Sequence, residues 1–512
     1  MAGLMGDLIG STQALTNHAS SLNVIGRNLS NINNASYARQ IVTTESYGGP
    51  GGAIYTRSQT TSARDSILDR QVSAEASITG ALEEQQNFYS QLNNVMSEQL
   101  NGSMGASLET AQAQGVGITG ALSSMFNSWS SLSASPNSYG AKSEVFNNAD
   151  ELVSRLNDAS AAIDEVASVQ NERLDQNLDE ANALLKKIAT LNGNIVRMEA
   201  RQSGSSSALK DERQSSLEKL SSLMDFQTRN LPDGSVTLSL RDTLDAEGQT
   251  VPGLALVQGG AWGTLSAEQG SPLTLVDDVL VTENGLPPEE DENYVAPGLR
   301  LSFGEDTVAF STSSGSLSVL DPANTQAVLT QMRDKLDALA GQLISSVNAA
   351  YQEGGNGDFF SGTTAADIAL AVQDAASISA AGLDDPQGGN SVATAVAALS
   401  GNRFDPDAEP PLDPDTGLPM DVPQDLFRGT FLDFASGIAT DAASRLGATS
   451  DALDQQEQME SLVRNNRDNI SGVSTDEEMT DLLRAQNAYQ ASARVVNVLN
   501  TLLELVTTRL GA

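Results

Sequence analysis

The chain has 512 residues, with 28 Lys and Arg against 66 Asp and Glu, which gives a net charge of −38. This balance excludes a nucleic-acid partner, because phosphate binding relies on clustered cations. The absence of Cys excludes disulfides and thiolate chemistry, and the single histidine, His18, leaves little basis for a histidine metal site or a Ser–His–Asp triad.

The first predicted element is a long N-terminal helix. A mostly apolar stripe recurs at alternating spacings of four and three, the heptad pattern of a helix that pairs with another helix. Its positions are Leu4, Leu8, Ser11, Leu15, His18, Leu22, Ile25, Leu29 and Ile32. Between residues 1 and 40 the only charged side chains are Asp7, Arg27 and Arg39. A polar face almost without charge suits contact with other protein, because burying amides and hydroxyls costs less than burying charges.

The middle of the chain predicts a second helical layer that is interrupted by β structure. Stripes with the helical period cover residues 60–100, 145–166, 181–198 and 329–343. Between residues 229 and 321 the period changes to two, and Gly, Pro and Asp-Gly turns punctuate the sequence. A Pro/Asp-rich stretch within residues 401–430 indicates a loop or small insertion.

The last predicted element is a C-terminal helix that begins at a capping box formed by Ser474 and Glu477. Its stripe consists of Ala485, Ala488, Ser492, Val495, Leu499, Leu502 and Val506, and an adjacent face carries Leu482, Tyr489, Val496, Leu503 and Leu510. Like the N-terminal helix, it is poor in charge. The two terminal helices are therefore predicted to pair with each other.

Together these elements predict a mainly α, multidomain α+β fold with an inserted β-rich domain. Four parts are expected: a terminal helical pair (1–45 plus 470–512), a helical rod (60–228 plus 322–469), a β-rich domain at the far pole (229–321) and the small insertion (401–430). Two charge-poor helices that pack only on each other bury too little area to offset the entropy that they lose on ordering. We therefore expect the ends to be loose in the free monomer and to order on assembly.

Motifs that suggest chemistry are weak in this chain, and no catalytic residue, metal or cofactor is predicted. Gly115, Gly117 and Gly120 match the G-x-G-x-x-G pattern of a dinucleotide-binding loop. That loop follows a hydrophobic strand, but a polar run precedes these glycines. Asp413, Asp415 and Gly417 resemble a calcium loop that Pro414 interrupts, and the acidic run from Glu289 to Glu292 is unremarkable in so acidic a chain. His18 lies on the helical stripe, where a packing role is the simpler interpretation.

Both ends carry motifs that resemble the signatures of the axial proteins of the bacterial flagellum. At the N-terminus these are Asn28-Leu29-Ser30-Asn31-Ile32-Asn33-Asn34 and Tyr37-Ala38-Arg39-Gln40. At the C-terminus they are Asp476-Glu477-Glu478-Met479 and Gln486-Asn487-Ala488-Tyr489. Within that superfamily the Tyr37 motif, Asp211-Glu212-Arg213-Gln214 and Gly357-Asp358-Phe359-Phe360-Ser361-Gly362 most resemble the FlgK family of hook-associated proteins. Ser36 departs from the Gly that the family usually has there.

The resemblance implies a structural protein that joins the hook to the filament. Its implied partners are copies of itself in a ring, the flagellar hook protein, the second hook-associated junction protein and an export chaperone at the C-terminal helix. It also implies an extracellular location reached through the flagellar type III apparatus. The sequence agrees with export without a cleaved signal peptide, since the first basic residue is Arg27 and no apolar run precedes a small-residue cleavage site. No apolar run reaches the ~18 residues of a membrane span, so no membrane insertion is predicted.

Three alternatives remain open from the sequence. The chain could be another flagellar axial protein, such as a hook or distal rod protein. It could be a wall hydrolase carried on an axial scaffold, although two carboxylates in a cleft usually come with sugar-stacking aromatics and Trp is limited to Trp129 and Trp262. It could also be a surface adhesin whose binding face is the β-rich domain.

Overall fold

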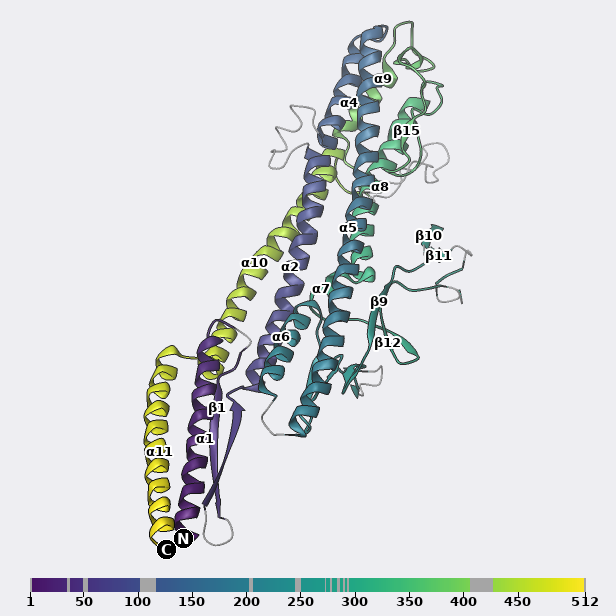
Figure 1. Cartoon of the computed structure of the whole chain (residues 1–512). Helices are drawn as coiled ribbons and strands as arrows, with labels where there is room; N and C mark the ends of the chain where they lie inside the picture. Colours follow the sequence, from purple (N-terminus) through teal and green to yellow (C-terminus); the bar gives the residue numbers. More distant parts are fainter. Residues whose placement is uncertain are drawn as a thin grey trace.

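The computed structural model describes residues 2–34, 37–48, 54–101, 117–201, 206–244, 250–271, 273–276, 279–282, 286–288, 291, 294–405 and 427–510. The molecule is a long helical rod with both chain ends at one pole, and strands lie along its side (Figure 1). The mainly α fold with long terminal helices and a β-rich insertion is thus confirmed. Several residues discussed above lie outside the described residues: Ser36, Gly115, Glu289, Glu290, Glu292, Asp413, Asp415 and Gly417.

The terminal helices α1 (Ala2–Ser30) and α11 (Thr475–Leu510) pack side by side and run antiparallel (Figure 1). A β-hairpin, which the sequence analysis missed, follows α1. Its strands β1 (Gln40–Gly48) and β2 (Ile54–Ser62) pair from Gln40↔Ser62 at the base to Gly48↔Ile54 near the turn. The hairpin packs along α1, so the terminal unit contains β structure as well as two helices.

The rod is built around three long helices. Two of them, α2 (Ser66–Asn101) and α10 (Phe431–Ser471), are far apart in the sequence but pack extensively against each other. The longest helix, α5 (Tyr139–Glu199), has 61 residues and spans about 90 Å at 1.5 Å per residue. Shorter helices complete this layer: α4 (Gly117–Ala134), α8 (Pro322–Gln352) and α9 (Ser391–Ala398).

Local chemistry explains where the rod helices begin. The Ser138 side chain accepts a hydrogen bond from the Ala141 amide at the start of α5, and Asp321 caps α8 just before a proline. Thr430 and Asp433 form a reciprocal capping box at the start of α10. Buried aromatic rings of Trp129, Tyr351 and Phe359 then pack edge to face, and this packing fixes how α4 and α8 meet.

The β-rich insertion lies beside the lower half of α5, together with α6 (Ser207–Leu223) and α7 (Ser316–Leu320). One sheet has the order β3-β4-β7-β8 and another β13-β12-β9. Their bounds are β3 (Gln227–Asn230), β4 (Val236–Ser239), β7 (Ala255–Gln258), β8 (Ala261–Trp262), β9 (Thr264–Glu268), β12 (Gly298–Phe303) and β13 (Asp306–Phe310). Two-stranded pairs join β5 (Thr243–Leu244) to β6 (Thr250–Val251), β10 (Leu273–Val276) to β11 (Val279–Thr282), and β14 (Phe360–Ser361) to β15 (Ala369–Leu370).

The position of the insertion corrects the sequence analysis. The far pole is occupied by α4, α9 and the start of α5, whereas the strands of the insertion lie along the side of the rod (Figure 1). Its core is also shared with the rod, because Leu185 of α5 and Leu220 of α6 pack in one cluster with Leu238 and Leu301 of the sheets. The expected boundary at residue 229 therefore passes through a continuous hydrophobic core.

Candidate assembly junction

Asn28, in the last turn of α1, is the polar centre at which the two ends of the chain meet. Its Nδ2 donates to Glu478 Oε2 at 2.9 Å and to the Gln40 carbonyl oxygen at 3.0 Å. Its Oδ1 accepts from the Gln40 backbone N–H at 3.0 Å and from the Tyr37 hydroxyl at 2.8 Å. Since both donors and the acceptor of this buried amide are satisfied, it fixes α1, the start of β1 and the start of α11 relative to one another.

Arg39 adds three ion pairs to the same junction. Its guanidinium lies 2.7 Å from Glu478 Oε1, 2.9 Å from Glu477 Oε2 and 3.2 Å from Asp481 Oδ2. The Glu478 side chain is only 1% exposed, against 63% for Glu477 and 41% for Asp481. Burial works against the charged form of Arg39, but the hydrogen bond to Glu478 and the charges of all three carboxylates raise its pKa above the ordinary value.

The base of the hairpin connects this junction to the rod. The Arg39 amide donates to the Ser471 carbonyl at the end of α10, and the Ala63 amide, just before α2, donates to the Arg39 carbonyl, both at 2.8 Å. The Tyr37 hydroxyl is buried beside these bonds. Burial and the negative charge of Asp211 raise the pKa of Tyr37 to about 12, so it remains a neutral hydrogen-bond donor at physiological pH.

Arg64 extends the polar contacts to two rod helices. Its guanidinium bonds Asp69 Oδ2 of α2 at 3.2 Å and Asp211 Oδ1 of α6 at 2.7 Å. Burial raises the pKa of both carboxyl groups, although Arg64 opposes that rise. One cation thus holds two nearly buried carboxylates from different helices beside the base of the hairpin.

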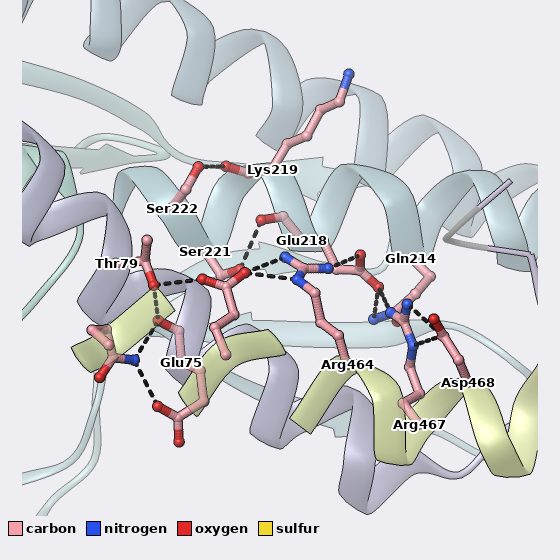
Figure 2. A network of polar contacts seen from close by, with 12 residues as sticks. Glu75, Thr79, Gln214, Glu218, Lys219, Ser221, Ser222, Arg464, Arg467 and Asp468 are labelled. Atoms are coloured by element: carbon pink, nitrogen blue, oxygen red, sulfur yellow. Dashed lines mark hydrogen bonds and ion pairs between the residues drawn. The ribbon is translucent and has the colours of Figure 1, made fainter. Parts of the chain in front are cut away.

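A second polar network joins α10 to α6 (Figure 2). Arg467 Nη1 donates to Glu218 Oε1 at 2.8 Å, and the Arg467 and Glu218 side chains are 4% and 9% exposed. Arg464 contacts Glu218 Oε2 at 3.5 Å and Glu460 Oε1 at 2.6 Å. The Thr79 hydroxyl of α2 donates to Glu460 Oε2 at 2.5 Å. Ion pairs therefore join the C-terminal part of α10 to α6, and a hydrogen bond between Glu460 and Thr79 joins it to α2.

The structure brings together the predicted motif residues from both ends of the chain. Asn28, Tyr37, Arg39 and Gln40 meet Glu477 and Glu478, although about 440 residues separate the two motifs. The other predicted motif residues stay outside this junction. Asn31 donates to the Arg27 carbonyl within its own helix end, while Asp476, Gln486 and Tyr489 are exposed.

Only some of the residues in the two predicted helical stripes are buried or half-buried in the structure. On α1, Ile25 is buried and Leu8, Leu15, Leu22 and Leu29 are half-buried; the Leu4 side chain lies outside the description, and Ile32, which follows the end of α1, is exposed. On α11, the half-buried positions are Ala485, Ala488, Ser492, Leu499 and Val506 from the predicted stripe and Leu482, Val496 and Leu503 from the adjacent face. Val495 and Leu502 are 48% and 42% exposed. Spacing alone had placed these two on the paired face.

Sequence reasoning missed Arg64, Glu218 and Arg467 as junction residues. Arg64 precedes α2 and pairs with carboxylates on α2 and α6, whereas Glu218 and Arg467 lie on different helices, 249 positions apart. A single charged residue in a helix is usually a solvated one, so its type and spacing contain no signal for such a pairing.

Within the described residues, no group of three or more His, Asp or Glu side chains is arranged to hold a metal ion. None of the helices in those ranges combines the length and the apolarity that crossing a membrane demands.

Comparison with known proteins gives matches along most of the chain. The family "Flagellar hook-associated protein FlgK helical domain" matches residues 106–364, and "Flagellar basal body rod FlgEFG protein C-terminal" matches residues 465–509. The chain is 24% identical to flagellar hook-associated protein 1 of Bacillus subtilis, over 98% of this chain and 97% of that protein. The solved structure of the flagellar hook junction protein FlgK from Burkholderia pseudomallei matches with a TM-score of 0.42 and 21% identity, over 57% of this chain and 46% of that one.

The C-terminal match falls on the end of α10 and on α11, the part of the chain that meets the N-terminal motif. The helical-domain match covers half of the chain and distinguishes it from hook and rod proteins, the first alternative left open by the sequence. The chain belongs to the FlgK family of flagellar hook-associated proteins, structural components of the junction between hook and filament.

Proposed function

We propose that α1 and α11 form the module through which copies of this chain assemble into a ring between the hook protein and the second hook-associated junction protein. The observation that carries this proposal is an apolar stripe on α11 that stays about half exposed. Val495, Val498, Leu502 and Leu505 follow one another at helical spacing and are 42–58% exposed. An uncovered apolar stripe on a helix is typical of a surface that another protein covers.

The thinness of the terminal pair supports assembly-dependent order. In the described part of α11, Glu478 has the only buried side chain. All of the apolar side chains described there are half-buried or exposed. At roughly 25 cal/mol per Å² of buried apolar area, such partial burial offsets little of the entropy lost on ordering two long helices. Contacts with neighbouring subunits would supply the missing burial. The earlier expectation that the free ends are loose stays a prediction.

The same stripe fits an export chaperone before assembly. A chaperone that covered Val498 and Leu502 would keep the stripe from associating prematurely and would release it for a neighbouring subunit afterwards. We place the assembled protein outside the cell, exported through the flagellar type III apparatus. The C-terminal family match, which rod proteins share, supports a common mode of assembly at this end.

The proposed role is mechanical and not catalytic. The polar side chains at the junction, those of Asn28, Arg39 and Glu478, use their hydrogen bonds to join α1, the hairpin and α11. No described feature favours a wall hydrolase or an adhesin as the primary role.

The proposal predicts that Val498→Asp blocks incorporation while the chain itself stays folded. Val498 is 58% exposed, so the change should alter the unfolding free energy by about 0.5 kcal/mol or less, whereas a charge at a covered contact is costly. The measurement is the fraction of hooks that bear filaments in cells whose only copy is the variant, together with thermal melting of the purified chain. We expect few filaments and unchanged melting.

Asn497→Asp is the matched control, because the neighbouring exposed residue gains the same charge on another face of α11. It should support normal filaments. Equal filament numbers in the two variants would contradict the assignment of the stripe to assembly.

A further inference from the structure

A cavity of about 800 Å³ lies where the base of the hairpin meets α2, α6 and the first sheet of the insertion. Four successive residues of β2, 59–62, line one wall, and residues 227, 228 and 230 of β3 line another. This volume falls within the range of sites that hold extended ligands, and it exceeds what a single inorganic anion needs.

Both strands at this cavity have a free edge. Among the described strands, β2 pairs only with β1, and β3 is the outermost strand of its four-stranded sheet. Successive residues of a strand point to opposite faces, so a wall made of successive residues is the edge of the strand and not one of its faces. Free edges present unpaired backbone N–H and C=O groups, which an added extended peptide can satisfy.

The cavity is cationic in a chain whose net charge is −38. Five cationic side chains line it, against the carboxylates of Asp69, Glu199 and Asp225. The cations are Arg64, Arg70, Lys210, Arg213 and Arg241. Arg64, Lys210 and Arg241 form ion pairs with carboxylates. No carboxylate of the described residues forms an ion pair with Arg70 or Arg213, so these two leave positive charge in the cavity wall.

Arg213 is the more informative of these two residues. It is 7% exposed, and its Nη1 donates to Asn192 Oδ1 at 2.8 Å and to the Gly234 carbonyl at 2.9 Å, both of them neutral acceptors. Burial, aided by the charge of Arg64 and opposed by the charge of Asp233, lowers the pKa of Arg213 to about 10, so the side chain remains charged at neutral pH. A buried guanidinium that no carboxylate contacts directly is costly, and an incoming carboxylate would offset that cost.

We propose that this cavity binds an extended acidic peptide segment of a neighbouring subunit. Its carboxylates pair with Arg213 and Arg70, and its backbone adds to the free edge of β2 or β3. The charge of each copy supports such an occupant, since 66 carboxylates make acidic segments abundant on neighbouring subunits. This interaction goes beyond the proposed ring contacts of α11, and either proposal can fail without the other.

The test measures binding of a fluorescent peptide to the full chain. The probe has the sequence of residues 288–294, which contains four successive carboxylates, and the comparison peptide carries Gln and Asn in their place. We expect Arg213→Gln to weaken binding of the acidic peptide about tenfold or more and the more exposed Arg70→Gln to weaken it about threefold. Arg333→Gln, on α8 and outside the cavity wall, is the control and should bind like the parent.

Two further comparisons separate the proposed chemistry from general charge attraction. N-methylation of alternate peptide residues removes backbone donors and should weaken binding about tenfold if the peptide pairs with a strand edge. Displacement by excess inorganic phosphate together with indifference to N-methylation would overturn the proposal in favour of a small-anion site. Equal binding of the acidic and neutral peptides would also overturn it. Because Arg213→Gln changes a buried residue, Arg70→Gln provides the second check: unchanged affinity in that folded variant counts against the proposal.

Discussion

Glu478→Ala is expected to release α11 from the rest of the molecule. The Glu478 side chain is 1% exposed and accepts hydrogen bonds from both Arg39 and Asn28. Removing one partner of a buried ion pair costs about 3–5 kcal/mol, and we expect the lower end because Arg39 keeps Glu477 and Asp481. The thin pair of terminal helices has little other burial to offset that loss. Because the terminal helices are expected to be loose in the free monomer, the measurement is amide exchange at the start of α11, residues 475–485, where this junction holds the helix. Exchange there should become faster, and filaments should be lost in cells.

Glu477→Ala is the matched control for this prediction. It removes a carboxylate from the neighbouring residue and from the same Arg39, but the Glu477 side chain is 63% exposed. Exposed ion pairs contribute about 0–1 kcal/mol, so exchange in α11 should stay close to that of the parent chain. The same exchange rates in both variants would show that the buried contact with Asn28 and Arg39 does not hold the terminal unit.

Arg467→Met is expected to destabilise the rod at the point where α10 meets α6. Arg467 is 4% exposed and contacts Glu218, which is 9% exposed, so the change leaves a nearly buried carboxylate with weaker partners. We expect a loss of about 3–5 kcal/mol in the unfolding free energy. Urea unfolding followed by circular dichroism measures it. Arg464→Met, whose arginine is one third exposed, should cost about 1 kcal/mol or less.

A double variant tests whether this loss comes from the stranded charge. When Glu218→Met is added to Arg467→Met, both charges disappear, and replacing a buried pair by apolar residues is often neutral or stabilising. Most of the lost stability should return. A double variant as unstable as Arg467→Met alone would mean that the arginine acts through packing and not through its charge.

The terminal helices could be predicted because heptad spacing and missing charge are both local properties of the sequence. Which face of α11 meets α1 could not be predicted. Val495 and Leu502 fit the same spacing as Leu499 and Val506, and a second apolar face carries Val496 and Leu503. When a helix has apolar residues on adjacent faces, periodicity cannot say which of them the first partner covers.

The hairpin had a local signal that the sequence analysis did not use. Its arms are rich in Thr, Ile, Val and Tyr, and the segment 48–52 between them reads Gly-Gly-Pro-Gly-Gly. The place of the β-rich insertion and the pair Arg467–Glu218 had none, and the motifs that contain Arg39 and Glu478 did not show that these two side chains pair. They depend on how the chain folds back over hundreds of residues, and the single side chains involved look like ordinary surface charges.

The most direct test of the account counts filament-bearing hooks in cells whose only copy of this protein carries Leu22→Asp or Leu499→Asp. Both leucines are half-buried between or beside the terminal helices, so a charge at either position should separate them while the rod stays folded. We expect bare hooks, loss of motility and normal melting of the rod. Cells that swim normally with full filaments would contradict the claim that the two ends of this chain pair to build the junction.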